Sequence, residues 1–236
     1  MSTRRTLAKS ESKSNNPATR FLEWKSNDKC FSYYDKEKKE NIKVELPLKF
    51  QFLEHFHVVK GFSDAEQTGI YSNEVMFTSK EPLTVKTYNN KTIAEGLYSD
   101  IRAKVRDAGG KYHKSIYVVD SNGDIINLQV KGSVVSAWST FLDGDKKLGI
   151  DGNGGKIESH WIEINKAQDL KKGATKYSVP VFKIGDVFNE DELEQADDAY
   201  RKVADYYNKY TEPKEEEDLA PLKPETEEEY EDDIFS

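Results

Sequence analysis

The stretch RFLEWKSNDKCFSYYDKEKKENIKVELPL, residues 20–48, decides the fold class of this chain. It holds three short segments rich in apolar and aromatic residues, separated by polar turns at residues 26–28 and 35–41. In the third segment Ile42 and Val44 alternate with charged residues, and a period of two is typical of a half-buried β-strand. The stretch therefore predicts three consecutive strands.

The rest of the chain continues this mainly β pattern. Further strands are predicted at residues 69–75, 83–88, 115–119, 125–131, 157–164 and 177–183. A turn around Asn122-Gly123 joins two of them into a hairpin. Residues 50–62 are rich in aromatic side chains but show no clear period, and residues 143–155 predict a polar, glycine-rich loop.

Three helices are predicted among these strands. The first ends at Gly109-Gly110, and its apolar face comprises Ala94, Leu97, Tyr98, Ile101 and Val105. The second spans residues 134–142, with Trp138 facing inward. The third begins at Asn189, with Glu192 three residues on as the partner in a capping box; its apolar face comprises Leu193, Ala196, Tyr200, Val203 and Tyr207. Many short strands with few helices predict an α+β, mainly β domain or a β-barrel.

Charge is distributed very unevenly along the chain. Residues 211–236 carry twelve acidic residues against two lysines, whereas residues 1–189 have a formal net charge of +6. A segment this charged cannot bury enough apolar surface to fold, so residues 211–236 predict a disordered tail. A basic body followed by an acidic tail indicates a polyanionic partner and a tail that can mimic it.

The tail nevertheless ends on two apolar residues that nothing in the tail can cover. Its tip comprises Glu231, Asp232, Asp233, Ile234 and Phe235, followed by Ser236. We interpret this tip as a partner-binding element for a basic-rimmed pocket on another protein. The alternative is a solubility tail with an accidental ending.

Composition bounds the other possibilities. We expect a basic, disordered arm at residues 1–16 and one domain at residues 17–210. The single cysteine, Cys30, excludes an intramolecular disulfide and fits a reducing compartment. The sequence shows no metal-ligand spacing, no apolar run long enough for a membrane span and no signal-peptide core.

Aromatic residues interleaved with lysines are the feature that points to a ligand. The first cluster comprises Trp24, Lys25, Lys29, Phe31, Tyr33, Tyr34, Lys36 and Lys38. A second set comprises Lys111, Tyr112, Lys114 and Lys131, with Lys146 and Lys147 in the glycine-rich loop. Rings that stack on bases and cations that follow phosphates are how proteins hold single-stranded nucleic acid. The alternative is that the rings fill the core and the lysines are solvated surface.

Enzymatic interpretations are weaker. Asp143 and Asp151 begin fragments that resemble a calcium loop, but both lack ligands at the remaining positions. Asp120, Gln129 and Lys131 on one hairpin resemble the carboxylate-and-lysine set of metal-dependent nucleases, with a glutamine in place of an acid. No phosphate-binding loop or catalytic triad stands out. We therefore expect no enzymatic activity and no metal or other cofactor.

The chain resembles the single-stranded DNA-binding proteins of tailed bacteriophages. The matching stretches are NPATRF (16–21), FSYYDK (31–36), LPL (46–48), GIYSNEV (69–75), GKY (110–112) and SVPVF (178–182). The resemblance implies an OB-like five-stranded barrel with added helices, and an acidic C-terminal tail that recruits replication proteins such as DNA polymerase or helicase/primase. The tip is also similar to that of bacterial single-strand binders, but no proline lies between Ile234 and Phe235 and Ser236 follows the phenylalanine.

These observations together predict a sequence-independent single-stranded DNA-binding protein of phage replication, recombination and repair, located in the cytoplasm of the infected bacterium. The acidic tail is expected to compete for the DNA groove and to bind partners when DNA displaces it. Self-association and a preference for DNA over RNA stay open. The alternatives are an acidic interaction or DNA-mimic protein that binds no DNA, and a metal-dependent nuclease.

Overall fold

The computed structural model describes residues 16–211, so the predicted N-terminal arm up to Asn15 and the tail beyond Thr211 lie outside it. Within this range the chain is a mainly β, α+β protein with three α-helices, as predicted, although Ala94, which was expected on the first helix, lies in the strand before it. In chain order the elements are β1 (Arg20–Lys25), β2 (Cys30–Asp35), β3 (Glu40–Val44), β4 (Leu48–Ser63), β5 (Thr68–Ser72), β6 (Leu83–Thr87), β7 (Thr92–Gly96), α1 (Tyr98–Asp107), β8 (Gly110–Asp120), β9 (Ile125–Lys131), α2 (Ser133–Asp143), β10 (Gly144–Asp145), a 3₁₀ turn (Lys146–Leu148), β11 (Ile150–Asp151), β12 (His160–Lys172), β13 (Thr175–Val187) and α3 (Glu190–Thr211).

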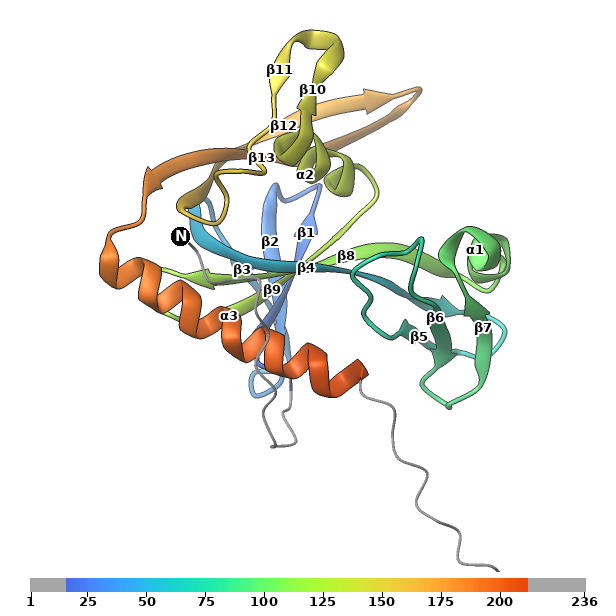
Figure 1. Cartoon of the computed structure of the whole chain (residues 1–236). Helices are drawn as coiled ribbons and strands as arrows, with labels where there is room; N and C mark the ends of the chain where they lie inside the picture. Colours follow the sequence, from blue (N-terminus) through green and yellow to red (C-terminus); the bar gives the residue numbers. More distant parts are fainter. Residues whose placement is uncertain (1–15, 212–236) are drawn as a thin grey trace, which may run out of the picture.

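Strand β4 is the spine of the molecule (Figure 1). One of its edges pairs with β8 along nearly its whole length, while the other edge is shared by β12 at its start and β5 at its end. The remaining strands extend from this spine in the order β3-β2-β1-β9-β8-β4-β5-β6-β7, with β1 and β9 parallel. Because β4 is covered on both faces, it lacks the alternation that marks a half-buried strand.

The strands form an open sheet of eleven strands, which corrects the expectation of a closed five-stranded barrel. Among the described residues β3, β7 and β13 each pair with only one neighbour. The sheet curls until β13 reaches the β1–β2 turn, but side chains make that contact. The Trp24 indole donates to the Ser178 carbonyl over 2.9 Å, the Ser178 hydroxyl donates to the Ser26 carbonyl, and the Ser178 amide donates to the Ser26 hydroxyl.

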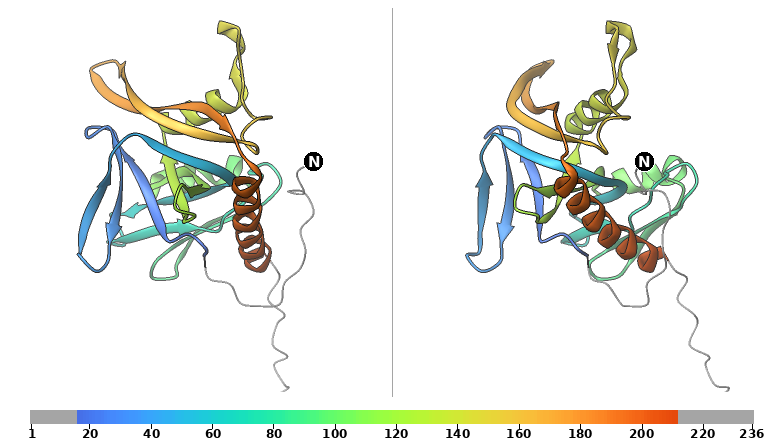
Figure 2. Two further views of the ribbon diagram at one scale, coloured as in Figure 1. Left: turned by 90° about the vertical axis from the view of Figure 1, so that its left-hand side faces the viewer. Right: turned by 60° about the vertical axis from the view of Figure 1, so that its left-hand side comes forward.

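The main core lies between the curved sheet on one side and α2 with the β12–β13 hairpin on the other (Figure 2). Trp138 of α2 is fully buried here, as predicted, and packs edge-on against Phe182. Phe31 is fully buried and Trp24 is 8% exposed, with their rings in edge contact at 5.1 Å. Both rings are therefore structural, since no base could reach them.

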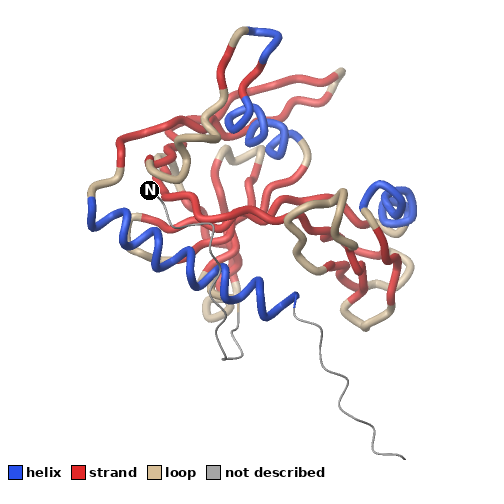
Figure 3. Tube along the Cα trace, viewed as in Figure 1, coloured by secondary structure: helices blue, strands red, loops and turns tan. Residues whose placement is uncertain are grey.

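The long helix α3 covers part of the opposite face of the sheet (Figure 3). It begins with the predicted capping box, in which Asn189 and Glu192 each accept the other's backbone N–H over 2.9 Å. Ala196 and Val203 are buried against the sheet, whereas Leu193, which was expected to be buried, is 38% exposed. The helix therefore covers only part of this face of the sheet and leaves the rest uncovered.

Strands β5–β7 and helix α1 form a small lobe with its own core at the far end of β4 and β8. The lobe joins the sheet where β4 and β8 approach very closely. A Cβ atom on Gly61 would lie 2.3 Å from the Gly109 carbonyl oxygen, and Gly109 itself has φ +95°. Glycine is needed at both positions, because a side chain would force the two strands apart.

Candidate nucleic-acid interface

The part of the sheet face that α3 leaves uncovered is the candidate site. Side chains alternate between faces along a strand. In β1, Leu22 and Trp24 point into the main core, so Phe21, Glu23 and Lys25 lie on the opposite face. Pairing between strands continues this face across β2, β9, β8 and β4. We call this uncovered surface the open face; its principal residues are Phe21, Glu23, Lys25, Tyr34, Lys60, Phe62, Tyr88, Lys111, Gln129 and Lys131.

Two grooves meet on the open face. The first, of about 700 Å³, lies along β1 and β2 and includes Phe21, Lys25 and Tyr34. The second, of about 750 Å³, lies where β9, β8 and β4 meet the small lobe. Glu23 lines both grooves and therefore marks their junction. The two grooves therefore adjoin at Glu23, and we call them together the path.

Exposed rings line this path. Phe21 is 42% exposed, Phe62 51%, Tyr34 58% and Tyr88 72%. The ammonium of Lys60 lies 5.7 Å from the centre of the Phe21 ring. Exposed rings of this size are costly to leave in water, and together with lysine they present surfaces on which bases can stack.

The ring of Tyr88 is held in place although it is highly exposed. It stacks on Tyr71 with ring centres 5.5 Å apart. It also lies directly over Gly69, where an added Cβ would come within 2.4 Å of the ring. This packing keeps one face of Tyr88 against the protein and the other toward the second groove.

The second groove carries an excess of positive charge. Lys60, Lys111 and Lys131 line it, against the acids Glu23 and Asp64. Lys60 pairs with Lys111 across β4 and β8, and Lys131 pairs with His113 across β8 and β9. The first groove is balanced, because Arg20, Lys25 and Lys36 face Glu23, Asp35 and Glu37. Phosphates are therefore favoured in the second groove.

Burial shapes the ionisation of this surface. Burial lowers the pKa of His113 to about 4, so its imidazole is neutral at neutral pH. Burial also lowers the pKa of the Lys60 ammonium, although the Glu74 and Glu23 carboxylates oppose the shift. Burial raises the pKa of the Glu23 carboxyl, but the hydrogen bond and charge of Lys25, with the charge of Lys131, outweigh it and hold that pKa below its usual value.

The structure brings together some of the predicted DNA-binding residues and separates others. Those on the open face are Lys25, Tyr34, Lys36, Lys111 and Lys131. Trp24 and Phe31 are core residues, which corrects their assignment as stacking rings. Trp24 alternates with Glu23 and Lys25 along β1, and Phe31 of β2 pairs with Trp24, so both rings lie on the covered face. The sequence alone does not say which of the two faces is covered.

The remaining predicted residues lie elsewhere or turn away. Tyr33 borders the first groove, but it is half-buried against the main core, with the Arg20 guanidinium 5.9 Å from the centre of its ring. Lys29 is paired with Asp169 over 2.6 Å, and Lys38 is exposed in the β2–β3 turn. Lys114 is 9% exposed and, like Tyr112, which contacts His57, it lies on the other face of β8. Lys146 is exposed in the 3₁₀ turn between β10 and β11 and lines neither groove, and nothing is described for the side chain of Lys147.

Sequence reasoning missed Phe21, Lys60, Phe62 and Tyr88, which are four of the ten principal residues of the open face. Phe21 belongs to a strand whose exposed face is not evident from the sequence, and Lys60 belongs to residues 50–62, which show no clear period. Phe62 of β4 and Tyr88, which follows β6, are 26 positions apart in the sequence, and only the small lobe brings them to one groove.

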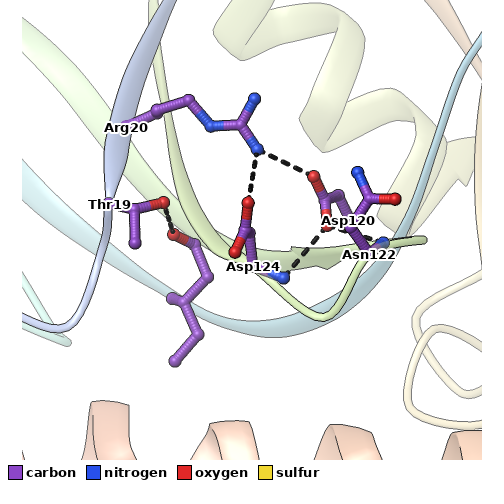
Figure 4. Close-up of polar contacts among 6 residues, drawn as sticks. Thr19, Arg20, Asp120, Asn122 and Asp124 are labelled. Atoms are coloured by element: carbon purple, nitrogen blue, oxygen red, sulfur yellow. Dashed lines mark hydrogen bonds and ion pairs between the residues drawn. The ribbon is translucent and has the colours of Figure 1, made fainter.

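The nuclease-like set is not assembled. Asp120 ends β8, where its carboxylate accepts the backbone N–H groups of Asn122 and Asp124 and pairs with Arg20 over 2.8 Å (Figure 4). Lys131 lies opposite His113 at the other end of the same hairpin. Seven residues of strand separate the two positions, or roughly 23 Å. Asp120 therefore closes the hairpin turn and anchors β1 through Arg20.

Among residues 16–211 no group of three or more histidine, cysteine or acidic side chains is arranged to hold a metal ion. In the same range no helix is long and apolar enough to cross a membrane. Comparison with known protein families, curated proteins and solved structures finds no match to this chain.

Proposed function

We propose that this protein binds single-stranded DNA along the open face, without reading a specific sequence, and acts in phage DNA replication, recombination and repair. The observation that carries the proposal is the gathering of exposed rings and lysines along two adjoining grooves. Stacking contributes about 1–3 kcal/mol per base and lysines neutralise phosphates. The path rests on an open sheet, so the proposal does not require the closed OB-type barrel that the resemblance implies.

The acidic tail has a second role in this proposal. Residues 211–236 carry a net charge of −10 and end on Ile234 and Phe235. The tail competes with DNA for the lysines of the second groove, and once displaced it recruits replication proteins through its apolar tip. The setting is the cytoplasm of an infected bacterium. Sequence resemblance and charge support this part, since the tail lies outside the described residues.

The proposal is tested by titrating the full-length protein into a dye-labelled oligo(dT) and following fluorescence anisotropy at several salt concentrations. A labelled oligonucleotide is the right probe because all three tryptophans, Trp24, Trp138 and Trp161, are at most 8% exposed. We expect saturable binding that weakens as salt rises.

Two outcomes would contradict the proposal. Absence of binding at low salt, also after removal of residues 212–236, favours the DNA-mimic or protein-binding alternative. Cleavage of the oligonucleotide in Mg²⁺ or Mn²⁺ that Asp120→Asn removes would favour the nuclease.

A further inference from the structure

The junction of the two grooves differs from the rest of the open face. Strand pairing aligns Ser32, Glu23, Gln129 and Ser115 in one row across β2, β1, β9 and β8. This row holds neither a ring nor a cation. Ser32, Gln129 and Ser115 are at most 7% exposed, whereas the Glu23 side chain is 43% exposed. Within this row Glu23 is therefore the accessible carboxylate, and it lies where the two grooves adjoin.

The neighbours of Glu23 on its own strand define what can lie above it. Lys25 is two residues away in one direction and Phe21 two residues away in the other, each at roughly 7 Å along the strand. Lys131 is two residues from Gln129 on the parallel strand β9, so it lies beside Lys25 on the same side of the row. A nucleotide whose phosphate lies at Lys25 and Lys131, with its base on Phe21, places the base edge over Glu23.

The state of the carboxylate decides which bases suit this position. The Lys25 ammonium donates to Oε2 of Glu23 over 3.2 Å, and Oε1 has no hydrogen-bond partner among the described residues. An ionised carboxylate only accepts hydrogen bonds. Cytosine and adenine offer an exocyclic amino group to such an acceptor, whereas thymine presents a carbonyl oxygen in the equivalent place.

We propose that Glu23 gives the open face a base preference, favouring strands rich in amino-bearing bases, cytosine above all, over thymine. This inference rests on the proposed function and specifies its substrate class. Every sequence is still bound, because stacking and phosphate contacts supply most of the affinity. The carboxylate adds an attractive contact to cytosine and a repulsive one to thymine, which together create the difference.

The test is a competition titration with 15-nucleotide oligo(dC) and oligo(dT) against full-length protein, at pH 7.5 so that oligo(dC) stays unprotonated. We expect oligo(dC) to bind about fivefold more tightly, the size of one partly exposed charge-assisted hydrogen bond. Glu23→Gln keeps the shape and adds a donor, so the ratio should fall toward one. Gln129→Glu, which adds a second acid to the row, should widen it.

Glu95→Gln is the matched control, because Glu95 is exposed on β7 and lines neither groove. It should leave the ratio unchanged. Equal binding of the two oligonucleotides by the wild type, a preference for oligo(dT), or an unchanged ratio in Glu23→Gln would overturn the inference while leaving the proposed function standing. Failure to bind either oligonucleotide would instead overturn the proposed function.

Discussion

Neutralising the exposed lysines of the second groove is the most direct perturbation of the proposed DNA path. Lys111 and Lys131 lie on the adjacent strands β8 and β9, and both side chains are exposed. Among the described residues neither lysine forms an ion pair, and exposed substitutions of this kind change stability by less than about 0.5 kcal/mol. The Lys111→Gln/Lys131→Gln variant should therefore fold normally.

The expected loss of DNA affinity follows from the release of counterions when lysines neutralise phosphates. Each phosphate neutralised on a single strand contributes about 0.7 to the slope of log K against log salt. Losing two such contacts should reduce the slope by about 1.4. At 0.1 M salt this corresponds to roughly 25-fold weaker binding, or about 2 kcal/mol.

The assay is the anisotropy titration at four salt concentrations between about 0.05 and 0.3 M, a range over which screening changes strongly. The control is Lys104→Gln/Lys172→Gln, which removes the same charge from exposed positions on α1 and β12 that line neither groove. If both double variants lower affinity equally, net charge rather than the groove governs binding. If the groove variant keeps the wild-type slope, the phosphate path has been placed wrongly.

Three further results are expected. Phe21→Ala should weaken oligo(dT) binding by about 1–3 kcal/mol without changing the salt slope, because it removes a stacking surface and no charge; a melting temperature several degrees below wild type would show instead that Phe21 is structural. Deleting residues 212–236 should tighten DNA binding at low salt and abolish recruitment of replication proteins; unchanged affinity at low salt would argue against competition by the tail. Stability should fall on acidification, because the pKa of His113 is about 4 in the folded chain against 6.5 ordinarily, so the unfolded state binds more protons between these values. Urea unfolding at pH 7 and pH 5 should show His113→Gln losing less stability than wild type over this interval, at most about 1.4 kcal/mol per pH unit less; equal losses would show that His113 is not the responsible group.

Local sequence features predicted much of the secondary structure, because they act within a few residues. The capping box of Asn189 and Glu192 satisfies backbone N–H groups at the start of α3. Gly109 after α1 and Gly123 in the hairpin turn each adopt the positive φ that the chain needs there. The spacing of apolar residues around Trp138 likewise marked α2 and its buried side. Such features need no knowledge of the rest of the chain.

Other elements escaped prediction because their environment is set from afar. Residues 50–62 showed no period since β4 is buried between the main core and α3, so both of its faces are apolar. Strands β12 and β13 run well beyond their predicted ends because they pair with each other as a long hairpin. Whether the sheet closes into a barrel could not be predicted either, because closure depends on pairing between strands far apart in the chain.

Sequence by itself determined that this chain is mainly β, that rings and lysines are interleaved near its N-terminus, and that strong negative charge is confined to its C-terminal end, because composition and period are local properties. Only the tertiary structure decided which rings are available. An alternating strand such as β1 offers two faces, Leu22 and Trp24 on one and Phe21 and Lys25 on the other, and the packing of α2 and β13 against the first face left the second to solvent.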